Sequence, residues 1–136
     1  MSELRDDARL AHAIAEEAGR LLVAIQAECA EGARGDREAN ALILDRLRTA
    51  RPEDAILSEE SADDPVRLSR SRVWIVDPLD GTREFAERRH DWAVHVALAI
   101  DGTAAVGAVA LPKLGVTLSS DAPPALAPAH APPRML

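Results

Sequence analysis

The segment Val73–Phe85 (VWIVDPLDGTREF) places two carboxylates three residues apart, directly after an apolar run. Asp77 ends the run, and Pro78 is expected to turn the chain so that Asp77 and Asp80 point into one small volume. Like charges held close together repel each other unless a cation lies between them. Mg²⁺ prefers oxygen ligands, and the Leu79 carbonyl between the carboxylates would add another. The segment therefore predicts a divalent-cation site.

The next two residues extend this site toward an anion. Gly81 lets a ligand approach the backbone closely, because glycine has no Cβ. Thr82 stands at the expected start of a helix, where unpaired backbone N–H groups favour phosphate. The pattern Asp-Gly-Thr therefore predicts a phosphate group beside the cation.

Two helices are expected to precede the site. Apolar residues recur at helical spacing from about Leu4 to Ala30, and again from about Arg37 to Ala50. Gly32 and Gly35 are expected to end the first helix, because glycine favours helix stops. Asp36 is expected at the start of the second helix, where aspartate is a good N-cap.

Short strands are expected after the helices, because the later segments are rich in β-branched and apolar residues. A tight turn is expected at Asp101-Gly102, between two of them. Helices followed by a strand meander predict an α+β fold, with two N-terminal helices packed on a mainly antiparallel β-sheet. The expected strands are Ala55–Ser58, Arg72–Val76, Trp92–Ile100, Thr103–Leu111 and Val116–Ser119.

The end of the chain differs in composition from the rest. Residues 121–136 hold five of the nine prolines. Proline fits neither a helix interior nor a sheet ladder. We therefore expect one α+β portion over residues 1–120 and an Ala/Pro-rich irregular tail over residues 121–136.

The charge balance and the lengths of the apolar runs limit the kinds of partner that are expected. The chain has 16 basic and 23 acidic residues, a net charge of −7. Polymeric nucleic acid requires a basic surface, so we expect no such partner. No apolar run is long enough to span a bilayer, so we expect no membrane partner. The charged N-terminus lacks the apolar core of a signal peptide, and the single Cys29 allows no intrachain disulfide. These features favour the cytoplasm.

The motif DPLDGTREF at 77–85, with an apolar strand before it and SEES at 58–61, resembles the inositol monophosphatase superfamily. Members share D-P-[IL]-D-G-T and an upstream Glu-Glu pair. The resemblance runs in the same order from the first helix to about Ser120. Within the superfamily, Arg83-Glu84 and the segment GDREANALILDRLR…LSEE are most similar to the actinobacterial branch of CysQ-type 3′(2′),5′-bisphosphate nucleotidases.

The resemblance implies a fold, an activity and a cofactor. The fold is the N-terminal part of the inositol monophosphatase and sugar phosphatase fold. The activity is that of a phosphoric monoester hydrolase that removes the 3′-phosphate of 3′-phosphoadenosine 5′-phosphate, a small phosphorylated substrate from sulfate assimilation. The implied cofactor is Mg²⁺, as two or three ions, and inhibition by lithium is expected.

The resemblance also assigns the metal ligands. Glu59, Asp77 and the Leu79 carbonyl would hold one Mg²⁺, and Asp77 and Asp80 would share a second. Glu60 would lie behind these ligands without contacting the metal.

The remaining roles concern the substrate and the attacking water. Thr82, oriented by Asp36, would help to activate the water, so that Asp36, Glu59 and Thr82 are the implied catalytic residues. Asp80 and the amides of Gly81 and Thr82 are the implied substrate-binding groups.

Plainer interpretations stay open. Asp36 alone is a good helix cap, Glu59 and Glu60 are compatible with a solvated loop, and Asp77-Pro78 resembles ordinary turn chemistry. His95 is interpreted as a half-buried imidazole with a hydrogen-bond partner. An inositol-1-monophosphatase, a non-catalytic metal-binding remnant and a homodimer also stay open.

Family members continue into a second half that carries a Trp-Asp motif, whose Asp is a further metal ligand. No such motif follows Ser120. The resemblance therefore implies a C-terminally truncated chain with little activity and an exposed apolar face or edge of the sheet.

Overall fold

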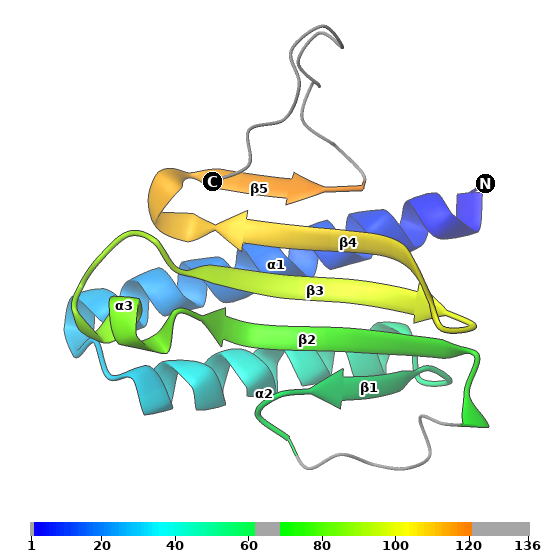
Figure 1. The fold of residues 1–136 in the computed structure, drawn as a ribbon, viewed down its shortest axis with the longest axis horizontal. Helices are drawn as coiled ribbons and strands as arrows, with labels where there is room; N and C mark the ends of the chain where they lie inside the picture. The colour runs from blue at the N-terminus through cyan, green and yellow to red at the C-terminus, as the bar shows by residue number, and fades with distance from the viewer. Residues whose placement is uncertain (1, 62–68, 121–136) are drawn as a thin grey trace, which may run out of the picture.

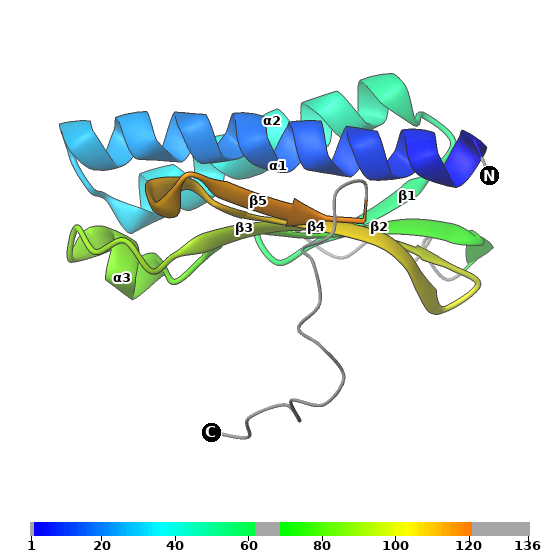
Figure 2. The ribbon, with the colours of Figure 1, turned by 90° about the horizontal axis from the view of Figure 1, so that it is seen from above.

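The computed structural model describes residues 2–61 and 69–120 of the chain. Helices α1 (Ser2–Glu28) and α2 (Gly32–Ala50) lie on one side of a five-stranded sheet (Figures 1 and 2). The predicted α+β fold with two N-terminal helices on a sheet is confirmed. The expected tail at 121–136 lies outside the described residues. Neither described long helix is apolar enough to cross a membrane.

The sheet has the order β1-β2-β3-β4-β5, which follows the chain. The first pair is parallel and the others are antiparallel, so the mainly antiparallel prediction is confirmed. Because β1 and β2 run in the same direction, both end at the same edge of the sheet. The strands are β1 (Ala55–Ser58), β2 (Arg72–Asp80), β3 (Ala93–Ile100), β4 (Thr103–Leu111) and β5 (Val116–Ser119).

The predicted junction between the two long helices is wrong. Helix α1 ends at Glu28, and Ala30 takes a positive φ of 51°. Gly32 is the first residue of α2, and Asp36 lies inside that helix instead of capping it. Gly35 is buried within α2, where a Cβ would come within 3.1–3.3 Å of side chains from three other elements. These two glycines allow close packing; they do not terminate a helix.

The core lies between the helices and the sheet. Alternate side chains of β2, β3 and β4 face the helices and are buried, as the period of a strand requires. Trp74 and Trp92 are 0% and 1% exposed. The largest fully buried apolar side chains are Trp74, Trp92, Phe85, Leu22, Ile25, Ile43, Leu47, Leu98, Val76, Val94 and Val96.

The other face of the sheet carries no helix in the described part of the chain (Figure 2). Ile75, Val116 and Leu118 are 44%, 40% and 37% exposed. Leu118 pairs with Val109, which lies on the same face of β4. We call this surface the open face; it exposes apolar side chains on β2 and on the edge strand β5.

A buried ionic network closes the fold at the start of β2. Asp7 of α1 is fully buried, and its Oδ1 accepts hydrogen bonds from Arg51 Nε at 2.9 Å and Arg72 Nη2 at 3.0 Å. Asp54 accepts hydrogen bonds from Arg72 Nε at 3.0 Å and Trp74 Nε1 at 2.9 Å. The network therefore joins α1, the end of α2, and β2 at the end of β2 opposite to the Asp77–Asp80 segment.

Candidate metal and phosphate site

The parallel pairing of β1 with β2 brings Glu59 beside Asp77. Ser58 is the partner of Val76 in the register, and the Glu59 N–H donates to the Val76 carbonyl at 3.3 Å. Glu59 and Asp77 therefore each directly follow one residue of the Ser58–Val76 pair. In open sheets, the carboxyl ends of parallel strands are a common place for ligand binding. Two of the predicted metal ligands thus meet at one edge of the sheet.

A bulge in β2 brings Asp80 to the same face as Asp77. Asp77 pairs with His95 and Asp80 pairs with Ala93, so β2 has one more residue than β3 between these pairs. In a regular strand, a spacing of three would place the two carboxylates on opposite faces. The extra residue restores a common face. Asp77, Asp80 and His95 all lie on the open face.

The predicted turn at Pro78 is wrong, because Pro78 lies within β2. β2 has partners on both sides, and proline cannot donate to a sheet ladder. A bulge is one of the few places in a central strand that accepts proline. The motif therefore brings its carboxylates together by a strand irregularity instead of a reverse turn.

The short helix α3 (Thr82–Ala86) begins where the sequence predicts it. Gly81 precedes it with a φ of +96°, and a Cβ on Gly81 would lie 3.1 Å from Trp92 Cβ. The Phe85 ring meets the Trp92 ring edge to face at 5.1 Å, and both rings are buried. This pair packs α3 against the residue that precedes β3 and so holds Gly81 and Thr82 in place.

Thr82 lies against the first turn of α2. A Cβ on Gly32 would come 2.5 Å from Thr82 Cγ2, so the contact requires glycine at position 32. Asp36 is one turn further along the same helix. No hydrogen bond joins Thr82 to Asp36 within the part of the chain that the structure describes. The orienting role of Asp36 stays a prediction.

The acidic residues repel one another. Burial, together with the charges of Glu60, Asp77 and Glu59, raises the pKa of Asp36 to about 6. Burial, with repulsion from Glu59 and Asp80, also raises the pKa of Asp77, although His95 and a hydrogen bond from the Leu79 N–H oppose the shift. Asp36, Glu59, Glu60, Asp77 and Asp80 therefore form one electrostatic cluster, which we call the acidic cluster.

The pKa of Asp36 predicts an unusual pH dependence. Between its ordinary value of 3.8 and about 6, the folded chain binds this proton more tightly than the unfolded chain. The free energy of unfolding contributed by Asp36 is therefore lost as pH rises through this window, and Asp77 acts in the same direction. Urea denaturation of the metal-free chain at several pH values measures this. Asp36→Asn should flatten the decline between about pH 4 and pH 6; equal slopes in both proteins would contradict the assignment.

Asn40 holds the Glu59–Glu60 turn, a role that was not predicted from the sequence. Its Oδ1 accepts a hydrogen bond from Ser58 Oγ at 2.5 Å, and its Nδ2 donates to Ser61 Oγ at 2.9 Å. The Ser58 hydroxyl also accepts the Glu60 N–H at 3.2 Å. The spacing of four from Asp36, which puts both side chains on one face of α2, was the available signal.

Asn40→Leu should destabilise the chain by about 1–3 kcal/mol, because it leaves the buried Ser58 hydroxyl without its acceptor. Urea denaturation at constant pH gives the value. Ser61→Ala is the matched control, since it removes one bond of the same amide at a partly exposed hydroxyl, and its cost should be smaller. An equal loss of stability in the two variants would argue against this role of Asn40.

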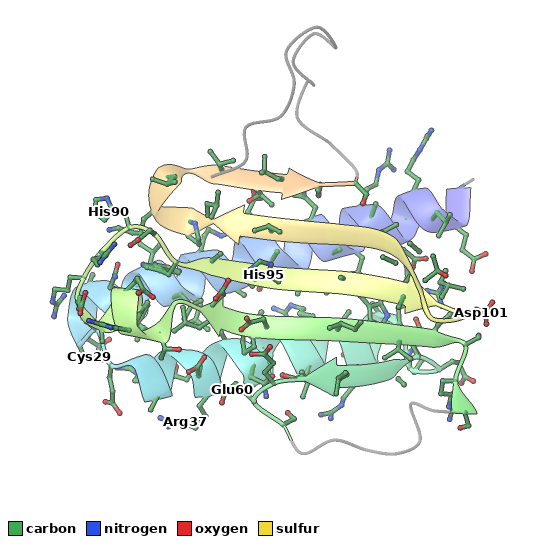
Figure 3. All side chains as sticks on the ribbon, in the orientation of Figure 1. Cys29, Arg37, Glu60, His90, His95 and Asp101 are labelled. Carbon is green, nitrogen blue, oxygen red and sulfur yellow. The ribbon has the colours of Figure 1, made fainter. Side chains whose placement is uncertain are left out.

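His95, like Asn40, contacts the site although no role in the site was predicted for it. Its Nε2 lies 3.0 Å from Asp80 Oδ2, and the two side chains are 40% and 61% exposed. Figure 3 shows His95 on β3 and Glu60 beyond the end of β1. The prediction of a half-buried imidazole with a hydrogen-bond partner is confirmed.

The chemistry of the donors fits a hard cation such as Mg²⁺. Carboxylate oxygens are its preferred ligands, and their mutual repulsion would be relieved by a bound positive charge. Among residues 2–61 and 69–120, no three acidic, histidine or cysteine side chains are already gathered as a closed ligand set. The fit therefore rests on the kind of donors and on their mutual repulsion.

The sequence of this chain matches the model of the inositol monophosphatase family over residues 30–122. The chain belongs to the inositol monophosphatase family. The matched residues run from just before the start of α2 to just after the end of β5, so they include every element that contributes to the site. It confirms the resemblance carried by the Asp-Pro-Leu-Asp-Gly-Thr motif.

Curated relatives within the family support the nucleotidase branch. The chain is 52% identical to a 3′-phosphoadenosine 5′-phosphate phosphatase of Mycobacterium leprae, over 80% of this chain and 46% of the relative. It is 42% identical to the 3′(2′),5′-bisphosphate nucleotidase CysQ of Escherichia coli, over 62% of this chain and 35% of the relative. The chain thus spans about half the length of the first of these relatives.

Solved structures of the family confirm the fold. The extragenic suppressor protein suhB of Bartonella henselae superposes with a TM-score of 0.76 and 31% identity, over 82% of this chain and 46% of that protein. SuhB of Mycobacterium tuberculosis gives a TM-score of 0.73 and 29% identity, over 83% of this chain and 43% of that protein. The helices and sheet described above are therefore those of the family fold.

Proposed function

We propose that this chain is the metal-binding portion of a Mg²⁺-dependent phosphomonoesterase that removes the 3′-phosphate of 3′-phosphoadenosine 5′-phosphate. The proposal is supported by the bulge that places Asp77 and Asp80 on one face of β2 and by the parallel pair that places Glu59 next to Asp77. The choice of substrate is supported by the name of the Mycobacterium leprae relative at 52% identity.

Glu59, Asp77, Asp80 and the Leu79 carbonyl would hold the cations. Bound Mg²⁺ supplies positive charge that stabilises the phosphate oxygens and makes water easier to deprotonate. The protein's contribution is to hold the donors on one rigid edge, where the backbone of β1 and β2 keeps their spacing.

Gly81 and Thr82 would bind the phosphate through their N–H groups, because they precede or begin α3. Asp36, mostly ionised at neutral pH with a pKa of about 6, would accept the Thr82 hydroxyl proton in a hydrogen bond. The hydroxyl oxygen would then face the water that attacks in line with the leaving ribose oxygen. Positioning of this water is the main task of Thr82.

The proposal also includes a metabolic process, a compartment and an inhibitor. Hydrolysis of 3′-phosphoadenosine 5′-phosphate would place the protein in sulfate assimilation in the cytoplasm, with activity sensitive to lithium. An inositol-1-monophosphatase is the second candidate, because a solved structure that is 26% identical to this chain is that of inositol monophosphate bound SaIMPase-II.

The test is phosphate release by the intact chain with Mg²⁺, from 3′-phosphoadenosine 5′-phosphate and from inositol 1-phosphate in parallel. We expect release from the nucleotide at well below about 1 s⁻¹, the low end of ordinary enzyme rates, because the chain spans half of its relatives. Thr82→Val should abolish it. Faster release from inositol 1-phosphate would favour the second candidate, and release unaffected by Thr82→Val would refute the proposal.

A further inference from the structure

We propose that His95 is a positioning residue that holds the Asp80 carboxylate in the orientation needed for cation binding. The inference rests on the proposed function, because it assumes that Asp80 is a metal ligand. It extends that function to a side chain on a different strand.

The register and one side-chain contact link His95 to both Asp77 and Asp80. His95 is directly opposite Asp77 in the β2–β3 register, and its Nε2 lies 3.0 Å from Asp80 Oδ2. Because Asp80 itself pairs with Ala93, the His95 side chain contacts Asp80 diagonally across the β2–β3 pair. His95 therefore lies on the open face next to both carboxylate positions.

The chemistry of the contact is that of a donor to an ionised carboxylate. An ionised carboxylate only accepts hydrogen bonds, so Nε2 carries the hydrogen and donates it to Oδ2. The bond uses one of the two Asp80 oxygens, and the side chain as a whole is 61% exposed, so the second oxygen is available to a ligand. Outer partners of this kind orient metal-binding groups, and their loss typically weakens metal affinity by about 10- to 100-fold.

Asp80 needs such a restraint more than the other acidic groups. Its side chain is 61% exposed, whereas Asp77 is half-buried and receives a hydrogen bond from the Leu79 N–H. An exposed carboxylate on a strand samples several rotamers, and fixing it on binding costs conformational entropy. A hydrogen bond to His95 restricts these rotamers before the cation arrives.

The test is calorimetric titration of the intact chain with Mg²⁺ alone. His95→Leu removes the donor, His95→Gln keeps a donor amide of similar reach, and His90→Leu is the control at an exposed histidine outside the acidic cluster. We expect His95→Leu to weaken Mg²⁺ binding by about 10-fold, with His95→Gln and His90→Leu close to the wild type. The thermal midpoint of each variant without Mg²⁺ should stay near that of the wild type, because the imidazole is partly exposed.

The outcomes separate this inference from the proposed function. A wild-type chain that binds no Mg²⁺ would refute the metal site itself. Wild-type binding with unchanged affinity in His95→Leu would overturn only the role of His95. If His95→Gln binds as weakly as His95→Leu, the imidazole acts otherwise than as a hydrogen-bond donor, which also overturns the inference.

Discussion

Asp77→Asn should weaken Mg²⁺ binding by at least about 100-fold, because loss of an outer partner alone typically costs 10- to 100-fold. Asp77 is the one carboxylate that the family resemblance assigns to both cations. The amide oxygen that replaces it carries no charge, so the substitution removes part of the attraction that holds a hard cation.

The same variant should be more stable than the wild type when no metal is present. Burial and repulsion from Glu59 and Asp80 raise the pKa of Asp77, which means that its charge destabilises the folded chain at neutral pH. Removing the charge removes this cost. A gain in stability with a loss of binding is the pattern expected of a functional residue and not of a structural one.

Magnesium titration and urea denaturation of Asp77→Asn provide both readouts. Asp101→Asn is the matched control, because Asp101 lies exposed in the β3–β4 turn, away from the acidic cluster (Figure 3). Asparagine tolerates the φ of 52° at that position. Unchanged Mg²⁺ affinity in Asp77→Asn, or equal effects in the two variants, would remove Asp77 from the site.

Arg72→Met should lower the free energy of unfolding by about 3–5 kcal/mol, the usual cost of breaking a buried ion pair from one side. Asp7 is 0% exposed, and Arg72 is one of two arginines that donate to it. The substitution also removes the donor to both oxygens of Asp54. Two buried charges would each lose a partner at the junction of α1, α2 and β2.

Arg46→Met supplies the comparison. Arg46 pairs with Glu17 at 2.7 Å, but both side chains are exposed or partly exposed. Such surface pairs contribute about 0–1 kcal/mol, so this variant should denature close to the wild type. Urea denaturation of both proteins under the same conditions gives the two values. A similar small loss for Arg72→Met would show that the network adds little to stability.

The short motif made much of the site predictable. The order of residues in the motif predicted that Thr82 begins a helix, and the structure confirms this. It also predicted that Asp77 and Asp80 point into one volume, and the structure places both on one face of β2. These are local properties of a strand and the turn of helix after it. The grouping of the helices on one side followed from their apolar stripes.

The remaining features depend on contacts between distant segments. Glu59 reaches Asp77 through parallel pairing, which no local pattern specifies. The common face of Asp77 and Asp80 depends on a bulge that is visible only against β3. Asn40 showed only a helical spacing, while its partners Ser58 and Ser61 lie 18 and 21 residues away.

The predicted end of the first helix was wrong at two glycines for a related reason. Gly32 and Gly35 resemble helix stops when only their neighbours in sequence are considered. Their true constraint is close approach by Thr82 to Gly32 and by Leu79 and Phe85 to Gly35. Consequently the second helix begins earlier than expected, and Asp36 lies within it.

Paramagnetic broadening of backbone amide signals by substoichiometric Mn²⁺ is the most direct test that Glu59, Asp77 and Asp80 bind a divalent cation together. The account predicts selective loss of the amide signals of these three residues and of Gly81, reversed by excess Mg²⁺. Signals of Asp7, Asp54 and Asp101 should persist, although these residues are also acidic. Broadening centred on any of those three, or spread evenly over the acidic surface, would contradict the account.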